Sequence, residues 1–302
     1  MAFPAGDAFA VASSIGFAAS NVLVAQGMRG GRDDNGAFLS LLVTLVLSGG
    51  LWAVLGAARG FEAVTWRGVA WFCGAGVFSM FVGRVFSYAS IARLGAMRGS
   101  TMKRLIPFFS VMLGVGVLGE RLTTGMLAGM ALIVASFALL LARERGGGPG
   151  AGKAPAAGLN AGYIYGPVSA LGYAAGSLLR KMGLAEAHDA LLGAALGSVV
   201  GVALFLATAA FSAPYARAVR STFRRPSGWL LGAGTAATCG QVFYFAALDR
   251  APLARVALIS SSEIFVTLLL GWIFLKRTET LTLPVVAAAV LGFAGAALVI
   301  GV

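Results

Sequence analysis

Long apolar blocks constrain this chain more than any other feature of its sequence. A helix that crosses a membrane needs about 20 mostly apolar residues, and ten blocks of this kind follow one another along the 302 residues. They lie at residues 6–28, 36–58, 67–91, 97–118, 124–142, 160–181, 189–211, 228–248, 252–275 and 282–301. The pattern predicts an all-α polytopic membrane protein with ten transmembrane helices.

The composition excludes a water-soluble globular protein. Apolar residues make up 59% of the chain and charged residues only 11%, whereas soluble domains contain about 25% charged residues. The net charge of +12 comes from basic residues between the apolar blocks, which indicates contacts with lipid head groups and not with nucleic acid. We therefore expect a multi-pass protein of the inner (plasma) membrane with membrane lipids as neighbours. A monomer and a homodimer are both compatible with the sequence.

The second half of the chain repeats the first. At an offset of 157, residues 83–114 and 240–271 are identical at nine positions, including Gly83/Gly240, Phe86/Phe243 and Arg93/Arg250. At an offset of 156, residues 13–27 and 169–183 share six identities. Two separate regions with almost the same offset indicate a duplication, with a first repeat at 1–142, a flexible Gly- and Pro-rich linker at 143–159 and a second repeat at 160–302.

Each repeat holds five predicted helices, and an odd number inverts the second copy in the membrane. Two inverted five-helix repeats are typical of transporters, because the halves can exchange conformations and open a central site to each side in turn. We expect such a site to be lined by the first, third, fourth, sixth, eighth and ninth spans.

The stretch RLIPFFSVMLGVGVLGERLT (104–123) resembles a pattern of the drug/metabolite transporter superfamily, in particular its EamA-type ten-helix metabolite exporters. Pro107 and the Gly119–Glu120 pair carry the resemblance, while the second copy has Ile264 and Arg277 at the positions of Pro107 and Glu120. The resemblance implies secondary transport of small metabolites, often outward, without naming a substrate.

Glu263 is the strongest candidate for function, because an ionisable group inside a membrane helix costs about 2.5–3.5 kcal/mol on insertion scales. It lies near the middle of the ninth span, after three serines that include Ser261. We consider it a carrier of a coupling proton or a partner for a substrate amino group. A buried pair with an arginine, or a hydrogen bond between packed helices, would explain it equally well.

Basic residues of the first repeat could bind an anion. Arg84 lies in the third span with Tyr88 one turn further on, and its repeat mate is Gln241. A guanidinium can bind a carboxylate or phosphate through two parallel hydrogen bonds, although a side chain so close to the helix end can also reach the head groups. Lys103 and Arg104 open the fourth span, and either an anion-attracting vestibule or lipid anchoring accounts for them.

Weaker candidates are Asn21, its mate Ser177, and Tyr244, because polar groups in mid-span often only join helices. We expect Glu120 and Arg121 to form a structural charge pair in a short turn. Cys73 and Cys239 fall inside apolar blocks and are not repeat mates, so we expect two unpaired thiols.

Enzyme chemistry is not expected. One histidine cannot build a zinc site or a catalytic triad, and the chain lacks a phosphate-binding loop of the GxxxxGK[ST] type, so we expect no metal, no cofactor and no ATP-driven step. The side of the membrane on which the termini lie stays open, because the distribution of Lys and Arg favours the outside and the family resemblance favours the cytoplasm.

The function that the sequence favours is a secondary transporter with alternating access. It would move a small organic metabolite, an amino acid or an organic anion, with outward transport favoured and H+ as a possible coupling ion. The predicted substrate-binding residues are Arg84, Tyr88, Lys103, Arg104, Gln241, Tyr244, Glu263, Asn21 and Ser261, with Glu263 also in the coupling role. The alternatives are a flippase for a phosphorylated lipid carrier and a membrane scaffold or receptor that transports nothing.

Overall fold

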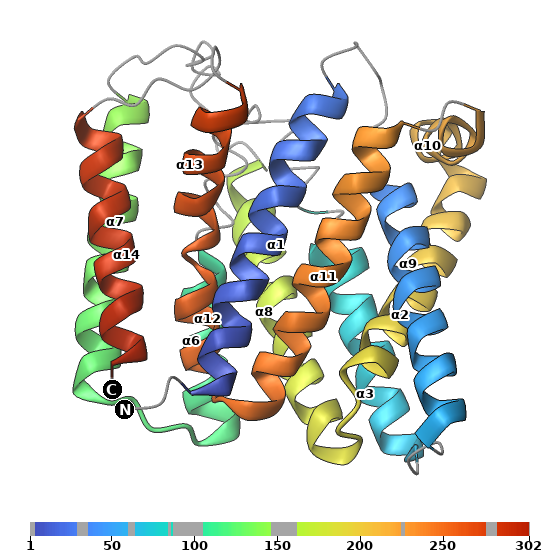
Figure 1. Ribbon diagram of the computed structural model, residues 1–302, viewed down its shortest axis with the longest axis horizontal. Helices are drawn as coiled ribbons and strands as arrows, with labels where there is room; N and C mark the ends of the chain where they lie inside the picture. Colours follow the sequence, from blue (N-terminus) through green and yellow to red (C-terminus); the bar gives the residue numbers. More distant parts are fainter. Residues whose placement is uncertain are drawn as a thin grey trace.

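The computed structural model describes residues 4–28, 36–59, 64–83, 86, 105–145, 162–224, 227–275 and 283–301. These residues form helices and their connections, and no strand occurs among them. The helices are α1 (Ala5–Met28), α2 (Ala37–Arg59), α3 (Trp66–Gly76), the π-helix η1 (Val77–Gly83), α6 (Ile106–Leu118), α7 (Thr124–Arg145), α8 (Gly162–Glu186), α9 (Ala190–Phe211), α10 (Ala213–Arg224), α11 (Gly228–Arg250), α12 (Leu253–Ser260), α13 (Glu263–Leu275) and α14 (Leu283–Ile300). Most of them run side by side along one direction, and both termini lie at the same end of the bundle (Figure 1). We call this end the terminal end.

Helix lengths and hydropathy indicate a membrane protein. Four stretches are long and apolar enough to cross a bilayer: Ala5–Gly27, Ala37–Ala58, Ala190–Phe211 and Leu253–Gly271. Shorter apolar helices occur at Ile106–Leu118, Thr124–Leu139 and Val286–Ile300. Each of the ten apolar blocks identified in the sequence overlaps at least one helix.

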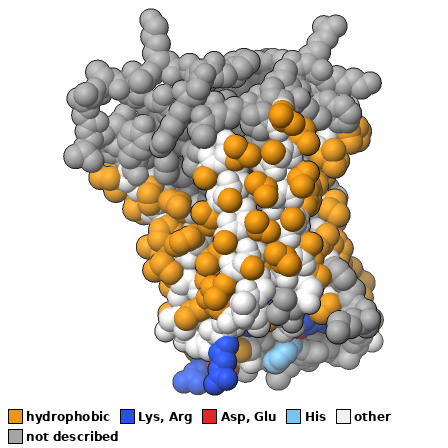
Figure 2. All heavy atoms as spheres, turned by 90° about the vertical axis from the view of Figure 1, so that its left-hand side faces the viewer, with side chains coloured by type: hydrophobic (Ala, Val, Ile, Leu, Met, Phe, Trp, Pro, Cys, Tyr) orange, Lys and Arg blue, Asp and Glu red, His pale blue; other side chains and the backbone are white. Residues whose placement is uncertain are grey.

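The outside of the bundle is apolar. Large hydrophobic side chains such as Val46, Val54, Met112 and Val290 are each more than half exposed. Figure 2 shows apolar side chains covering the flank of the molecule, with Lys and Arg gathered below them. A soluble monomer rarely exposes such a contiguous apolar surface, so lipid is the solvent that this flank requires.

The first helices of the two repeats run in opposite directions. A Cβ added at Gly6, near the start of α1, would lie 2.9 Å from the Cβ of Ala251. Lys181, near the end of α8, donates a hydrogen bond of 2.8 Å to the carbonyl of the same Ala251. The start of α1 and the end of α8 therefore meet at one end of α11, which is the antiparallel relation expected of inverted copies.

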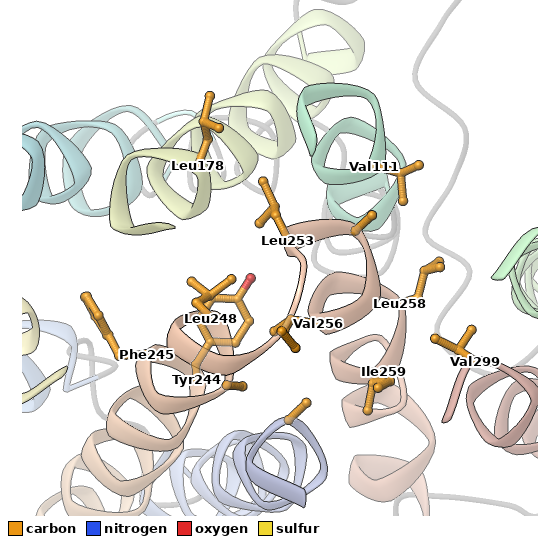
Figure 3. Packing of buried hydrophobic residues seen from close by; sticks show 14 of the residues in the cluster. Val111, Leu178, Tyr244, Phe245, Leu248, Leu253, Val256, Leu258, Ile259 and Val299 are labelled. Atoms are coloured by element: carbon orange, nitrogen blue, oxygen red, sulfur yellow. The ribbon is translucent and has the colours of Figure 1, made fainter. Parts of the chain in front are cut away.

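Close packing of α1 on α11 depends on glycine. A Cβ on Gly16 would lie 2.7 Å from Cα of Gly240 and 3.1 Å from the carbonyl oxygen of Ala236. Small residues allow two backbones to approach this closely in a membrane protein. A buried cluster continues from α11 into α12 through Tyr244, Leu248, Leu253 and Val256 (Figure 3).

Glu120 has a structural role, but not the one predicted. Its side chain does not form an ion pair with Arg121 among the described residues, and it instead accepts hydrogen bonds from the backbone N–H groups of Leu253 (2.5 Å) and Ala254 (2.8 Å). These N–H groups open α12 and have no partner inside that helix. A carboxylate also favours the positive end of a helix dipole, so Glu120 caps α12 from the turn after α6.

One helix was not anticipated from the sequence. Residues 213–224 form α10 with Arg217 and Arg220 exposed on it, and Figure 1 shows it lying across the end of the bundle opposite the terminal end. An amphipathic helix in this place suits the plane of the membrane interface. The thiols of Cys73 and Cys239 are free, as predicted.

Candidate functional site

The ninth apolar block is not one continuous helix. α12 ends at Ser260 and α13 begins at Glu263, with a tight turn at Ser261 and Ser262 between them. Serine favours such a turn because its hydroxyl competes with the backbone for hydrogen bonds, and the Ser261 hydroxyl donates to the carbonyl of Leu258 at 2.6 Å. Interrupted helices recur at the substrate and ion sites of secondary transporters.

Glu263 begins the second half of this interrupted block, and its carboxylate faces α1. Asn21 donates a hydrogen bond of 2.8 Å to Oε1 of Glu263 and a longer one of 3.4 Å to the hydroxyl of Thr267. Asn21 is exposed and Glu263 is partly exposed. The pair therefore joins the two repeats, and it is the hydrogen bond between packed helices that the sequence offered as one explanation of Glu263.

Three of the remaining predicted residues lie in the α12–α13 turn and on α11. Ser261 is buried in the turn next to Glu263. On α11, Tyr244 donates a hydrogen bond of 3.2 Å to the hydroxyl of Ser177 in α8. Gln241, one turn before Tyr244, is 8% exposed, and its Nε2 has no hydrogen-bond partner among the described residues. A buried amide group without a partner costs free energy, so the Gln241 amide is a donor that a bound ligand would satisfy.

Arg84, Tyr88, Lys103 and Arg104 lie outside the described residues. The part of the predicted site that the first repeat contributes through its third and fourth spans therefore stays a prediction. Asn21, Gln241, Tyr244, Ser261 and Glu263 all occupy α1, α11 or the α12–α13 turn.

The sequence reasoning missed Arg180. This residue lies in α8, and its guanidinium donates a hydrogen bond of 3.0 Å to the hydroxyl of Ser79 in η1. Its Cζ also lies 5.9 Å from the centre of the Tyr244 ring and 5.1 Å from that of Phe245. The comparison of the two repeats contained a signal for this residue: Arg180 and Lys181 are basic, whereas the first copy has the apolar Val24 and Ala25 at these positions.

A cavity of about 1150 Å³ opens at the terminal end of the bundle. Its apolar wall includes Trp71, Phe78, Leu179 and Met182, while Lys181, Glu120 and other charged residues line it elsewhere. Its lining comes from α3, η1, α6 and the turn after it, α8, the end of α11 and the connection from α11 to α12. None of the described residues predicted to bind substrate lines it. This cavity is therefore not the central cavity expected from the sequence. Its volume would admit a small organic molecule.

No group of three or more His, Cys, Asp or Glu side chains in the described ranges is arranged to hold a metal ion. The polar groups brought together here are a carboxylate, amides, hydroxyls and a guanidinium. Their chemistry is that of reversible binding through hydrogen bonds and ion pairs.

Comparison with known proteins identifies the family. A search of curated proteins finds no significant match. A solved crystal structure is similar to the chain with a TM-score of 0.65 at 17% sequence identity, over 95% of each chain, and this likeness concerns the fold. The model of the EamA-like transporter family matches residues 4–142 and again residues 160–301. Because these two matches cover nearly the whole sequence, the chain belongs to the EamA-like transporter family.

Proposed function

We propose that this protein is a secondary transporter of the inner membrane that exports a small organic metabolite carrying an amino group and a carboxylate, such as an amino acid. In this proposal ten spans form two inverted five-helix repeats, at 1–142 and 160–302, which open a central site to each side of the membrane in turn. The opposite directions of α1 and α8 support this arrangement.

The pair of Asn21 and Glu263 is the observation that carries the proposal. A carboxylate inside a membrane protein is costly and is retained where it has a role, and this one accepts a hydrogen bond of 2.8 Å from Asn21 on the other repeat. The pair connects the first helix of one repeat to the interrupted helix of the other, so a movement between repeats changes its surroundings. We assign Glu263 to the substrate ammonium group and to a coupling proton that replaces it.

The cavity at the terminal end gives the solute a way into the bundle. It contains both acidic and basic groups over an apolar wall, which suits a zwitterion with an apolar side chain. On this proposal a solute enters or leaves there and passes along the face of α8 towards α11 and the α12–α13 turn.

Transport by purified protein in liposomes tests the proposal. The twenty L-amino acids are supplied as labelled substrates, with and without a pH gradient. We expect wild-type protein to move at least one of them faster when the gradient is present. Glu263→Gln should reduce that rate about tenfold or more and remove its dependence on the gradient. Glutamine has the shape of the glutamate side chain, but it carries no charge and cannot bind or release a proton.

Asp189→Asn is the matched control. Asp189 caps α9 by accepting from the N–H groups of Leu191 and Leu192, each at 2.9 Å, and asparagine caps a helix equally well. This acid-to-amide change should leave transport as in wild type. Transport by folded Glu263→Gln at the wild-type rate, with the same response to pH, contradicts the role of Glu263.

Thermal unfolding in detergent tests the class of substrate. A ligand present at 100 times its dissociation constant adds about 2.7 kcal/mol to the stability of the folded state. Amino acids should raise the melting temperature, whereas sugar phosphates and polyprenyl phosphates should not. A rise with polyprenyl phosphates alone would instead favour a lipid flippase.

A further inference from the structure

Arg180 is a cation inside the bundle for which the described residues supply no anion. A guanidinium has five N–H donors, and Arg180 uses one of them on Ser79. No carboxylate among the described residues forms an ion pair with it. Arginine in a membrane interior is costly and is retained where it binds something, so an unpaired guanidinium here needs an explanation.

The surroundings hold the guanidinium in place. Ser79 Oγ donates to the carbonyl of Ala75 at 2.6 Å, so the hydroxyl oxygen is left to accept from Arg180. Tyr244 and Phe245 present their rings at 5.9 and 5.1 Å, which is the range of a cation–π contact. These rings are almost fully buried, at 8% and 1% exposure, yet Arg180 itself is partly exposed. Ser79 and the two rings therefore fix the position of the guanidinium.

The backbone of the third helix is unusual at this point. Residues 77–83 adopt a π-helix that includes Ser79, and π-helical turns are frequently found at functional sites. The wider turn positions Ser79 beside Gly176 of α8, where an added Cβ would come within 2.8 Å of the Ser79 Cβ. Arg180 lies one turn after Gly176, so the two helices come close enough for the serine to orient the arginine.

A buried polar side chain on α11, Gln241, lies one turn from the tyrosine that contacts Arg180. Gln241 and Tyr244 are one turn apart on α11, and the Tyr244 ring lies next to Arg180. The Nε2 of Gln241 is buried without a partner among the described residues. An oxyanion near this face of α11 would accept hydrogen bonds from the Arg180 guanidinium and from the Gln241 amide. Both donors would then have an acceptor.

From these observations we infer that Arg180, oriented by Ser79 and assisted by Gln241, forms an anion subsite that binds the carboxylate of the transported solute. The inference rests on the proposed function and adds to it a second, separate contact: Glu263 on α13 takes the ammonium group, and Arg180 on α8 takes the carboxylate. It also defines the substrate class, because a solute without a carboxylate loses the Arg180 contact.

Binding of three matched sets of probes to the full-length protein in detergent tests this inference. The probes are the L-amino acids, their α-carboxamides, and the corresponding carboxylic acids without the amino group. In wild type we expect the amino acids and the deaminated acids to raise the melting temperature more than the amides. In Arg180→Gln the preference for carboxylic acids over the α-carboxamides should disappear. The affinity for amino acids should fall about tenfold or more.

Two further variants keep the test decisive if Arg180→Gln does not fold. Arg180→Lys keeps the charge and loses the planar fork, so carboxylate affinity should fall with the charge unchanged. Arg217→Gln is the matched control, because Arg217 is exposed on α10, and it should bind every probe as wild type does. Wild-type carboxylate affinity in Arg180→Gln or in Arg180→Lys overturns the inference, as does a wild type that binds no carboxylate.

The outcomes separate this inference from the proposed function. Loss of amine recognition in Glu263→Gln without any effect of Arg180 variants supports the transporter proposal and rejects the anion subsite. Binding of deaminated acids that depends on Arg180, in a protein that does not move amino acids, supports the subsite and rejects the amino-acid substrate.

Discussion

Asp7 in the first turn of α1 and Arg255 in α12 form an ion pair with two parallel hydrogen bonds. Nε of Arg255 donates to Oδ1 of Asp7 at 2.8 Å, and Nη2 donates to Oδ2 at 2.6 Å. Nη2 also donates to the carbonyl of Ile300 at 3.0 Å, so α1, α12 and α14 are joined at the terminal end. Asp7 is 1% exposed. Charge pairing of this geometry is strong because both carboxylate oxygens are engaged.

Breaking this pair should destabilise the protein. Asp7→Asn leaves the Arg255 guanidinium without its carboxylate, and removal of one partner of a buried pair costs about 3–5 kcal/mol. Thermal or denaturant unfolding in detergent measures the loss. In the double variant Asp7→Asn with Arg255→Gln the loss should be smaller than the sum of the two single changes, and strict additivity would show that the two residues do not interact.

Glu120→Ala should weaken the start of α12. The substitution leaves the N–H groups of Leu253 and Ala254 without their acceptor, at a cost of about 1–3 kcal/mol. Hydrogen exchange at these two amides should increase together with the loss of stability. Arg121→Ala is the control, because Arg121 is exposed in the same turn, and it should change neither quantity. An equal effect of Glu120→Ala and Arg121→Ala would contradict the capping role and support the charge pair predicted from the sequence.

Lys181→Met should loosen the junction between α11 and α12. The Lys181 ammonium donates to the carbonyls of Leu248 and Ala251, which are near the end of α11, where carbonyls lack partners within the helix. Methionine keeps an apolar side chain of similar length and removes the donor, so we expect a loss of about 1.5–3 kcal/mol. Lys181→Arg retains charged donors and should recover part of the stability. A folded Lys181→Met protein with unchanged unfolding would show that these bonds add nothing.

Gly16→Val should disrupt the contact between α1 and α11. The valine side chain would meet the backbone of Gly240 at 2.7 Å, and backbone cannot rotate away as a side chain can. Overpacking typically costs about 1–3 kcal/mol. Gly50→Val makes the same change in α2, where nothing lies within 4 Å of an added Cβ, so the difference between the two melting temperatures isolates the packing effect. Equal melting temperatures would mean that the helices can separate without cost.

The sequence determined the class of protein and its internal repetition. Apolar blocks of membrane-spanning length and the matches at offsets of 156 and 157 can be read directly from the order of residues. They depend on hydrophobicity and on length, both of which are local properties. The Glu263 candidate followed in the same way, because an acid within an apolar block is visible without any structure.

Tertiary structure alone decided which polar groups meet. Glu120 reaches the backbone of Leu253, 133 residues away, and Arg180 reaches Ser79, 101 residues away. Such contacts depend on how each helix is rotated about its axis and how closely it packs. The sequence of a helix that is apolar on every side does not define either of these. The sequence therefore placed Arg180 and Lys181 at the end of an apolar block. Only the packing of α8 against η1 and α11 brought Arg180 to Ser79 with no carboxylate partner among the described residues, and made Lys181 a cap for α11.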